Sequence, residues 1–243
     1  MRSEANYNTI PVGQLGIIAL PGCEELANKI DNYLIRWRFQ RNSEHKDTLA
    51  FAGYEKSTYL IDMNFPRFGT GEGKAALNQT VRGYDIYILC DVFNYGVTYK
   101  MYGMTVPMSP DEHFANLKRA ISAIEGKAKR VSVIMPMLYE GRQHKRSSRE
   151  SLDCAMMLQE LNAMGVENFI TFDAHDPRVM NAIPLCGFES ISPAYQMIKA
   201  AVNNVDNLKI NKDNIMIISP DEGGMGRCIY YSSVLGVDLG MFY

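Results

Sequence analysis

The sequence lacks both a long hydrophobic segment and an excess of charge of either sign. No apolar run approaches the roughly 18 residues that a membrane-spanning helix needs, and the polar residues 1–12 lack the layout of a secretory signal. Lys and Arg total 25 against 27 for Asp and Glu, a net charge of -2, which argues against a globally basic nucleic-acid-binding protein. We therefore expect a soluble, cytoplasmic protein with no membrane and no nucleic-acid partner.

Paired cysteines are also missing. The five cysteines lie far apart in the chain, and no two of them form a Cys-x-x-Cys motif. This spacing favours neither a zinc site nor a disulfide framework, and free thiols in a reducing cytosol are the simplest interpretation. The chain is rich in hydrophobic residues, at 47%, which is enough to build a packed core.

Short apolar runs alternate with helical patterns, which predicts a parallel sheet joined by right-handed crossovers. The predicted strands are residues 15–20, 57–63, 84–90, 131–135, 168–172 and 215–218. The predicted helices are residues 24–36, 111–125 and 195–205, together with one that ends at Gly165 and one that follows Gly224. Residues 36–46 have mixed charge and no clear period, so we expect a surface loop there.

The pattern divides into two α/β domains, residues 1–188 and residues 189–243. The second domain offers about two strands, and an open parallel sheet of that size leaves apolar faces and edges uncovered. We therefore expect it to be incomplete in this chain. Ligands of parallel sheets bind beyond the carboxyl ends of the strands, so the polar segments that follow strands are the candidate sites.

The first such segment, residues 140–150, is basic. Ser147-Ser148-Arg149-Glu150 has the pattern of a capping box, which predicts that a helix begins there. Guanidinium groups beside a helix N-terminus favour a polyphosphate. A solvated charged loop and a nucleic-acid patch are the alternatives, the latter weakened by the lack of a stacking aromatic residue beyond Tyr139.

The second segment is Asp173-Ala174-His175-Asp176, where two carboxylates and an imidazole could hold a magnesium–phosphate complex. An ordinary turn is the alternative, with Asp176 capping a helix that Pro177 starts.

The third segment, residues 219–227, places Asp221 beside Gly223 and Gly224. These glycines would let the backbone approach a ligand closely, and Asp221 could bind a metal. The segment is not a Walker A loop, because no Gly-Lys-Ser/Thr follows. A fourth segment, residues 65–72, reads as a hairpin with glycines at its turn.

The order of these segments is more specific than any one of them, and it resembles the ribose-phosphate pyrophosphokinase (phosphoribosyl pyrophosphate synthetase) family from about Gly16 to Tyr243. The matching motifs are Arg67-Phe68-x-x-Gly71-Glu72, Val81-Arg82-Gly83-x-Asp85, Arg142-Gln143 with Arg149-Glu150, Asp173-x-His175, and Ser219-Pro220-Asp221-x-Gly223-Gly224.

The resemblance implies two phosphoribosyltransferase-like α/β domains that assemble into a homo-oligomer. It also implies an enzyme that uses Mg2+ to transfer the diphosphoryl group of ATP to the anomeric hydroxyl of ribose 5-phosphate, for nucleotide biosynthesis. The products are phosphoribosyl pyrophosphate and AMP.

The resemblance assigns roles to individual residues. Phe68 and Glu72 would reach the adenine in a neighbouring subunit's site, and Arg142 and Gln143 would contact ATP. His175 would be catalytic and would bind the magnesium–ATP complex. Asp221 would lie on the metal side and, with Gly223 and Gly224, on the ribose 5-phosphate side.

The sequence also departs from the family pattern. Gly69-Thr70 replaces Ser-Asp, and His144-Lys145-Arg146 replaces Asp-Arg-Lys. The family continues beyond the position of Tyr243 into a basic catalytic loop and a loop that binds ribose 5-phosphate. Three hypotheses therefore stay open: part of a catalytic synthetase, a non-catalytic nucleotide-binding or regulatory relative, and an RNA-binding protein that uses the basic loop.

Overall fold

The computed structural model describes residues 12–44 and 56–242. The chain divides into two compact units, Met1–Ile191 and Ser192–Tyr243. The expectation that these correspond to two phosphoribosyltransferase-like domains stays a prediction. Within the described ranges, no helix combines the length and the apolar character that crossing a membrane requires.

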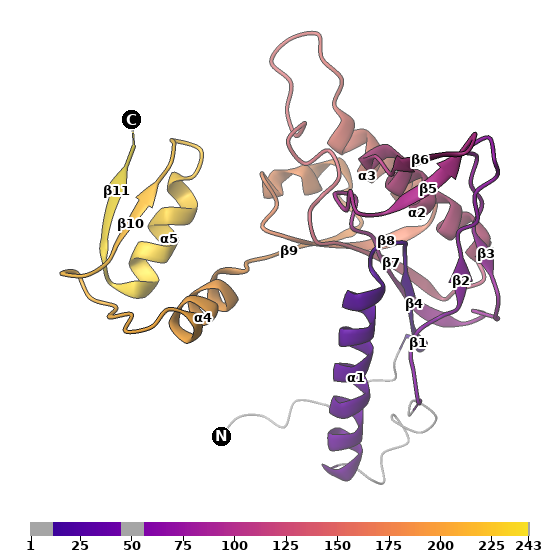
Figure 1. The fold of residues 1–243 in the computed structure, drawn as a ribbon, viewed down its shortest axis with the longest axis horizontal. Helices are drawn as coiled ribbons and strands as arrows, with labels where there is room; N and C mark the ends of the chain where they lie inside the picture. The colour runs from indigo at the N-terminus through magenta and orange to yellow at the C-terminus, as the bar shows by residue number, and fades with distance from the viewer. Residues whose placement is uncertain (1–11, 45–55, 243) are drawn as a thin grey trace. The chain divides into compact units, whose positions relative to one another are not determined.

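A parallel five-stranded sheet forms the centre of the first unit (Figure 1). In spatial order its strands are β1 (Gln14–Ala19), β4 (Tyr84–Leu89), β7 (Arg130–Met135), β8 (Val166–Phe172) and β9 (Gly187–Ile191). Each adjacent pair is parallel, which confirms the predicted α/β class. The central strands are apolar because both faces of the sheet are covered, as Ile86 and Ile88 of β4 illustrate: neither is exposed at all.

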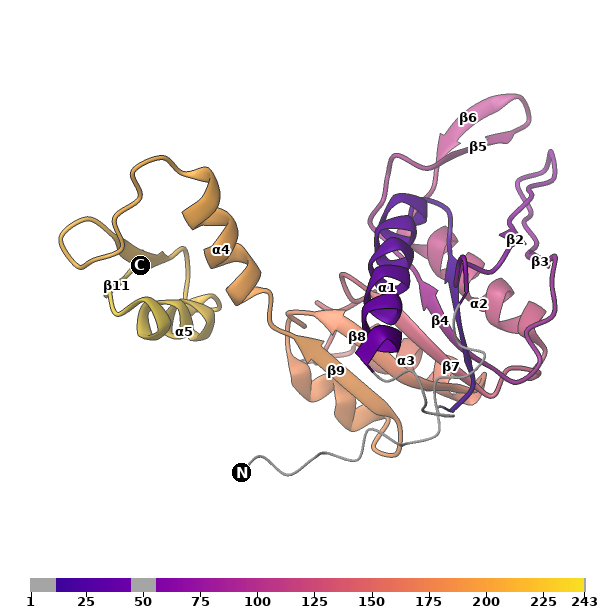
Figure 2. The same cartoon turned by 90° about the horizontal axis from the view of Figure 1, so that it is seen from below.

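Helices cover the two faces of this sheet unequally (Figure 2). Two of them, α2 (Pro110–Ile124) and α3 (Asp153–Ala163), pack their apolar residues into the main core with Ile18 and Phe169. On the other face α1 (Glu24–Glu44) packs against a smaller cluster that contains Ile17 and Leu89. Because neighbouring residues of a strand point to opposite faces, Ile17 and Ile18 belong to different clusters.

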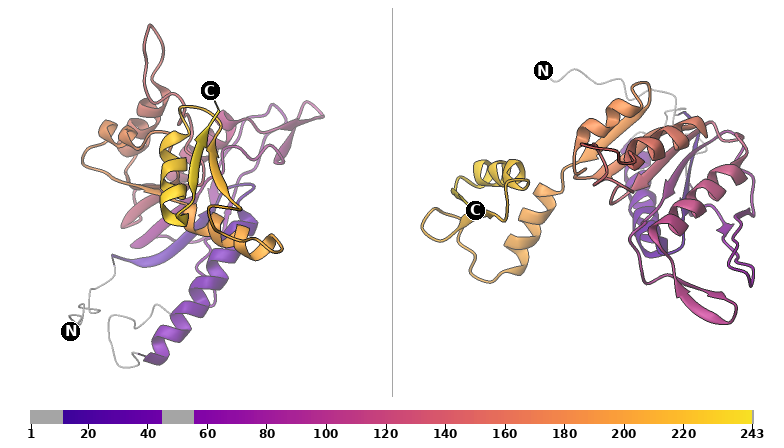
Figure 3. Two further views of the ribbon diagram at one scale, coloured as in Figure 1. Left: turned by 90° about the vertical axis from the view of Figure 1, so that its left-hand side faces the viewer. Right: turned by 90° about the horizontal axis from the view of Figure 1, so that it is seen from above.

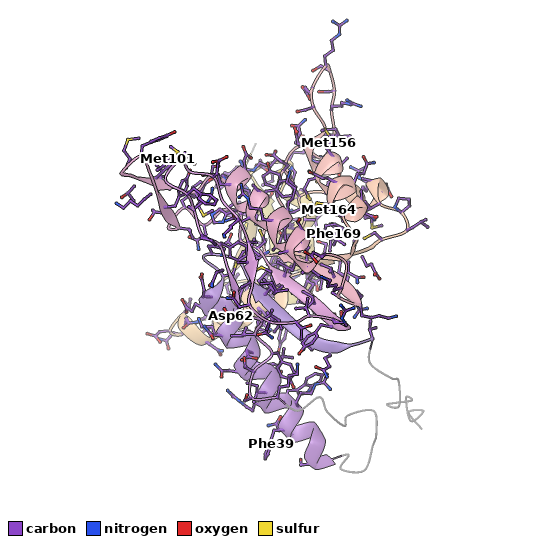
Figure 4. The ribbon with its side chains drawn as sticks, turned by 90° about the vertical axis from the view of Figure 1, so that its right-hand side faces the viewer. Phe39, Asp62, Met101, Met156, Met164 and Phe169 are labelled. Carbon is purple, nitrogen blue, oxygen red and sulfur yellow. The ribbon has the colours of Figure 1, made fainter. Side chains whose placement is uncertain are left out.

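The prediction of a surface loop at residues 36–46 is wrong for residues 36–44, because α1 continues to Glu44. Its second half contains good helix formers and neither glycine nor proline. The apolar period is missing because this half has little to pack against, as Phe39, which is 73% exposed, illustrates. Figure 4 shows Phe39 near the free end of the helix. Residues 45 and 46 lie outside the described ranges.

The strand expected at residues 57–63 is reduced to a bridge between Leu60 and Ile17 and to the short strand β2 (Met63–Asn64), which pairs with β3 (Ala76–Leu77). The buried carboxylate of Asp31 explains part of this. Its Oδ1 accepts a hydrogen bond of 2.7 Å from the backbone N–H of Tyr59, and this N–H is therefore not available to a sheet.

An antiparallel hairpin follows β4 and was not expected from the sequence. Its strands are β5 (Thr98–Met101) and β6 (Met104–Pro107). Tyr102 and Gly103 at the turn have φ of 48° and 82°, as a two-residue hairpin turn of the mirror-image type requires. Strands this short with exposed side chains produce little hydrophobic periodicity, which is why the sequence pattern missed them.

An ion pair joins two central strands at their amino ends. Asp85 of β4 and Arg130 of β7 are register partners, and the Arg130 Nε donates a hydrogen bond of 2.8 Å to Asp85 Oδ1. A second guanidinium nitrogen of Arg130 donates to the other carboxylate oxygen.

The second unit is a single β-α-β crossover preceded by a helix. Its elements are α4 (Ala194–Asn204), β10 (Met216–Ser219), α5 (Met225–Leu235) and β11 (Asp238–Met241), and the first three lie close to the predicted helix 195–205, the predicted strand 215–218 and the predicted helix after Gly224. The strands β10 and β11 pair in parallel, and Figure 3 shows α5, in yellow, beside them. Large apolar side chains on both the helix and the strands are exposed, including Ile218 at 47% and Ile229 at 49%.

Candidate active site

The carboxyl ends of β7 and β8 bring two of the predicted segments together. The strands are parallel neighbours, and the N–H of Phe172 donates a hydrogen bond of 3.2 Å to the carbonyl oxygen of Pro136 just where both strands end. The long loop after β7 and the short segment after β8 therefore leave the sheet side by side. Figure 1 shows the long loop extending beyond α3.

His144 joins these two segments. Its ring meets the ring of His175 edge to face, with centroids 4.9 Å apart and planes at 72°. Its Nε2 lies 3.8 Å from Oδ2 of Asp176, and its Nδ1 lies 3.0 Å from the carbonyl oxygen of Arg142. His144 thus contacts the backbone of Arg142 and the ring of His175, two predicted site residues whose side chains are both exposed.

Sequence reasoning did not single out His144 as a site residue. The histidine lies in a run of basic residues, where a charged surface loop is the default expectation. The available signal was its position two residues after Arg142, at a place where the family resemblance implies an aspartate. Only the folded loop shows that this position faces Asp176 and His175.

The structure confirms the ordinary turn that was one of the two predicted alternatives for the segment Asp173-Ala174-His175-Asp176. Asp176 caps the 3-10 helix η2 (Pro177–Ala182), and its Oδ1 accepts hydrogen bonds of 2.9 Å from both the backbone N–H and the Nε of Arg178. These hydrogen bonds from Arg178 hold the pKa of the Asp176 carboxyl well below its usual range. A charged Asp176 is therefore available to face His144.

Gln143 is held at the base of the long loop. Its side-chain amide donates a hydrogen bond of 2.8 Å to the carbonyl oxygen of Ser151, and its backbone N–H donates to the carbonyl oxygen of Glu140 at 2.9 Å. Glu140 has a φ of 53° and turns the chain sharply there. Burial, followed by the nearby Asp153 and Asp111, raises the pKa of Glu140. A contact between Gln143 and a nucleotide stays a prediction.

The capping box expected at Ser147–Glu150 is wrong. The helix α3 begins at Asp153, and its N-cap Leu152 makes no side-chain capping bond. The Ser148 hydroxyl instead bonds to the Glu150 carboxylate at 2.9 Å within the loop. Because the helix begins later, the exposed basic side chains of residues 142–149 precede its positive end instead of lying on it.

The loop that carries Phe68 and Glu72 connects β2 and β3. Two backbone hydrogen bonds close it, from Phe68 N to Glu72 O at 2.8 Å and from Gly71 N to Phe68 O at 2.9 Å. An antiparallel bridge between Arg67 and Gly73 confirms the predicted hairpin. Phe68 is 55% exposed and Glu72 is exposed as well, so both side chains can reach another molecule.

The glycine-rich segment of the second unit follows β10, as predicted. Asp221 Oδ1 accepts a hydrogen bond of 2.7 Å from the N–H of Gly224, and the buried Ser219 hydroxyl donates to the Asp221 carbonyl oxygen at 2.6 Å. A Cβ at position 224 would lie 2.9 Å from the Ser219 oxygen, so glycine suits that position. Because Asp221, Gly223 and Gly224 belong to the second unit, a role shared with His175 stays a prediction.

Metal-ligating side chains do not form a protein cage in the part of the chain that the structure describes. Among residues 12–44 and 56–242, no group of three His, Cys, Asp or Glu side chains is arranged to hold a metal ion.

Comparison with known proteins gives consistent matches. The family described as the N-terminal domain of ribose phosphate pyrophosphokinase matches residues 15–165. A ribose-phosphate pyrophosphokinase of Ralstonia nicotianae is 26% identical over 176 residues, covering 71% of this chain and 49% of the relative. One of Corynebacterium ammoniagenes is 26% identical over 163 residues, covering 66% of this chain and 45% of the relative. The chain thus spans about half the length of these relatives.

The fold is also found in a solved structure. The phosphoribosylpyrophosphate synthetase of Mycobacterium smegmatis superimposes with a TM-score of 0.68 at 18% sequence identity, over 94% of this chain and 63% of the other. This similarity supports the α/β architecture of the described residues.

Proposed function

This chain belongs to the family of the ribose phosphate pyrophosphokinase N-terminal domain. On that premise we propose that it acts as a ribose-phosphate diphosphokinase. The anomeric oxygen of ribose 5-phosphate attacks the β-phosphorus of ATP and loses its proton. The bond from that phosphorus to the oxygen that bridges it to the α-phosphorus breaks, and AMP leaves. The other product, phosphoribosyl pyrophosphate, would supply nucleotide biosynthesis in the cytoplasm.

The observation that carries this proposal is the cluster of His144, His175 and Asp176 at the carboxyl ends of β7 and β8, with His144 contacting the backbone of the exposed Arg142. Diphosphoryl transfer needs little covalent chemistry from the protein. It needs in-line positioning and positive charge where the phosphoryl oxygens gain negative charge. An exposed guanidinium and an imidazole oriented by its neighbours supply such parts.

Each residue has a task in this proposal. Arg142 binds phosphate oxygens through its guanidinium fork, and Gln143 holds the loop that carries it. His175 contacts the magnesium–nucleotide complex, and His144 fixes the orientation of its ring. Phe68 and Glu72 reach the base in a neighbouring copy of the chain, which makes a homo-oligomer part of the proposal.

The donor groups fit Mg2+ held largely by the nucleotide. Mg2+ prefers oxygen ligands, keeps several waters and usually takes only one or two carboxylates beside substrate phosphates. The exposed carboxylate of Asp221 can supply one such ligand, with Gly223 and Gly224 leaving room for the ribose 5-phosphate. When bound, Mg2+ neutralises charge on the phosphate oxygens.

The proposal is tested by incubating the protein with ATP, Mg2+ and ribose 5-phosphate and measuring AMP by chromatography. AMP that forms only when all three are present, and that is lost in His175→Ala, supports it. Magnesium–ATP binding without AMP formation would overturn catalysis in favour of a nucleotide-binding regulatory role. Absence of nucleotide binding would overturn both, and RNA binding that falls steeply with salt would favour the third hypothesis.

A further inference from the structure

The β5–β6 hairpin contacts the loop of Phe68–Glu72 at its tip. The N–H of Tyr102 donates a hydrogen bond of 2.8 Å to the carbonyl oxygen of Gly69. A Cβ on Gly71 would lie 2.8 Å from the Met101 sulfur, and Gly71 has a φ of 94°, so glycine permits this close packing. Figure 4 labels Met101 near the end of the hairpin. The hairpin and the loop are therefore in close contact.

A second contact lies behind the tip. The guanidinium of Arg67 lies over the ring of Tyr99, 4.5 Å from its centroid, and one of its nitrogens donates a hydrogen bond of 2.9 Å to the carbonyl oxygen of Gly71. The Arg67 side chain is only 11% exposed. The largely buried side chain that precedes the loop thus stacks on the hairpin and also holds the backbone of the loop.

This contact is anchored to the start of α2. The Tyr99 hydroxyl donates a hydrogen bond to Glu112 Oε1, and Glu112 Oε2 accepts one of 2.9 Å from the N–H of Ser109 in a capping box. Burial raises the pKa of Glu112, but the hydrogen bonds from Tyr99 and Ser109 and the charge of Arg67 outweigh it, and the net shift is downward. Glu112 therefore remains a charged acceptor, and the hairpin is attached to a rigid helix end.

We propose that the β5–β6 hairpin is a positioning element for the loop of Phe68–Glu72, with Arg67 and Tyr99 as the joint between them. A loop that contains Gly69 and Gly71 would otherwise lose much conformational freedom on meeting a ligand. By ordering this loop in advance, the joint keeps Phe68 and Glu72 oriented for a purine base. The consequence for nucleotide binding rests on the proposed function, whereas the ordering of the loop does not.

Amide hydrogen exchange of the full chain tests whether the joint, anchored to Glu112 through the Tyr99 hydroxyl, orders the loop. The N–H groups of Phe68 and Gly71 close the loop, so Tyr99→Phe should make both exchange at least about fivefold faster, as expected for the loss of one supporting hydrogen bond. Tyr33→Phe, which removes a hydroxyl from an exposed residue of α1, is the matched control and should leave both amides unchanged. Circular dichroism checks that each variant is folded.

A double-variant cycle then distinguishes a joint from two independent contacts. If Arg67 and Tyr99 act together, Arg67→Ala and Tyr99→Phe combined should accelerate exchange by clearly less than the product of their separate effects. Unchanged exchange in folded Tyr99→Phe would overturn the proposal, as would fully multiplicative effects.

The effect on nucleotide binding is measured separately from amide exchange. Tyr99→Phe should raise the apparent KM for ATP about threefold to tenfold while kcat stays within twofold, because the ordering cost moves to the binding step. Faster exchange with an unchanged KM would overturn the positioning role for nucleotide. If the unaltered protein binds no nucleotide, the proposed function fails, while the exchange data still decide whether the joint orders the loop.

Discussion

Arg142→Ala should separate nucleotide binding from stability. Among the described residues, the guanidinium of Arg142 makes no hydrogen bond or ion pair, and the side chain is exposed. Its loss should therefore change the free energy of unfolding by less than about 0.5 kcal/mol. A charge-assisted contact to phosphate contributes about 1.5–3 kcal/mol, so the dissociation constant for magnesium–ATP should rise about 10- to 150-fold.

The assay is a calorimetric titration with magnesium–ATP at fixed ionic strength, with thermal unfolding followed in parallel. Lys145→Ala is the matched control, because it removes one positive charge from an exposed position of the same loop. Screening by salt should limit its effect to roughly twofold. An unchanged dissociation constant in Arg142→Ala would remove this residue from the site. Equal weakening in both variants would show a diffuse charge effect instead of a specific contact.

Three further changes test other parts of the structure. His144→Ala removes the edge contact with His175 and should weaken magnesium–ATP binding roughly 2- to 10-fold, measured by the same titration; unaltered affinity would contradict its orienting role. Asp31→Ala leaves the N–H of Tyr59 without its acceptor and should lower the free energy of unfolding in urea by about 2–4 kcal/mol, whereas a loss below about 1 kcal/mol would contradict this account. Arg178 lowers the pKa of the Asp176 carboxyl in the folded state. The stability that their interaction contributes is therefore complete above the unfolded-state pKa of about 3.9, and it is lost as the pH falls through the lower pKa of the folded state. Arg178→Ala should therefore raise the titration midpoint of Asp176 in NMR, and an unmoved midpoint would refute the assigned cause.

Strands β1, β4, β7 and β8 of the sheet could be predicted because they carry buried apolar runs, whereas the edge strand β9, whose residues are mostly exposed, was not predicted. Apolar runs such as the one around Ile86 and Ile88 have few alternatives to a central strand, and the structure confirms them. The exposed hairpin of Thr98–Pro107 produced no such signal. The second half of α1 was missed for a related reason, since a helix without an apolar partner shows no hydrophobic period.

The capping box shows why local patterns can mislead. Both Ser109-x-x-Glu112 and Ser147-x-x-Glu150 satisfy the sequence rule, but only the first forms the two reciprocal hydrogen bonds. At the second position the Glu150 carboxylate accepts a hydrogen bond from the Ser148 hydroxyl within the loop, so the capping box does not form.

The candidate site was predictable only in part. Topology places the segments after β7 and β8 together, which the alternation of strands and helices already implied. The meeting of His144 with His175 depends on ring orientations that no spacing rule encodes. The pairing of His175 with Asp221, which lies in the second unit, stays a prediction.

The ion pair of Asp85 and Arg130 has a consequence for how this protein can change over evolutionary time. It holds two neighbouring strands in step at the end of the sheet opposite the candidate site. Insertions or substitutions in the loops beyond the other end can accumulate without letting those strands slip. Selection can therefore vary ligand preference there while the alignment of the scaffold is preserved.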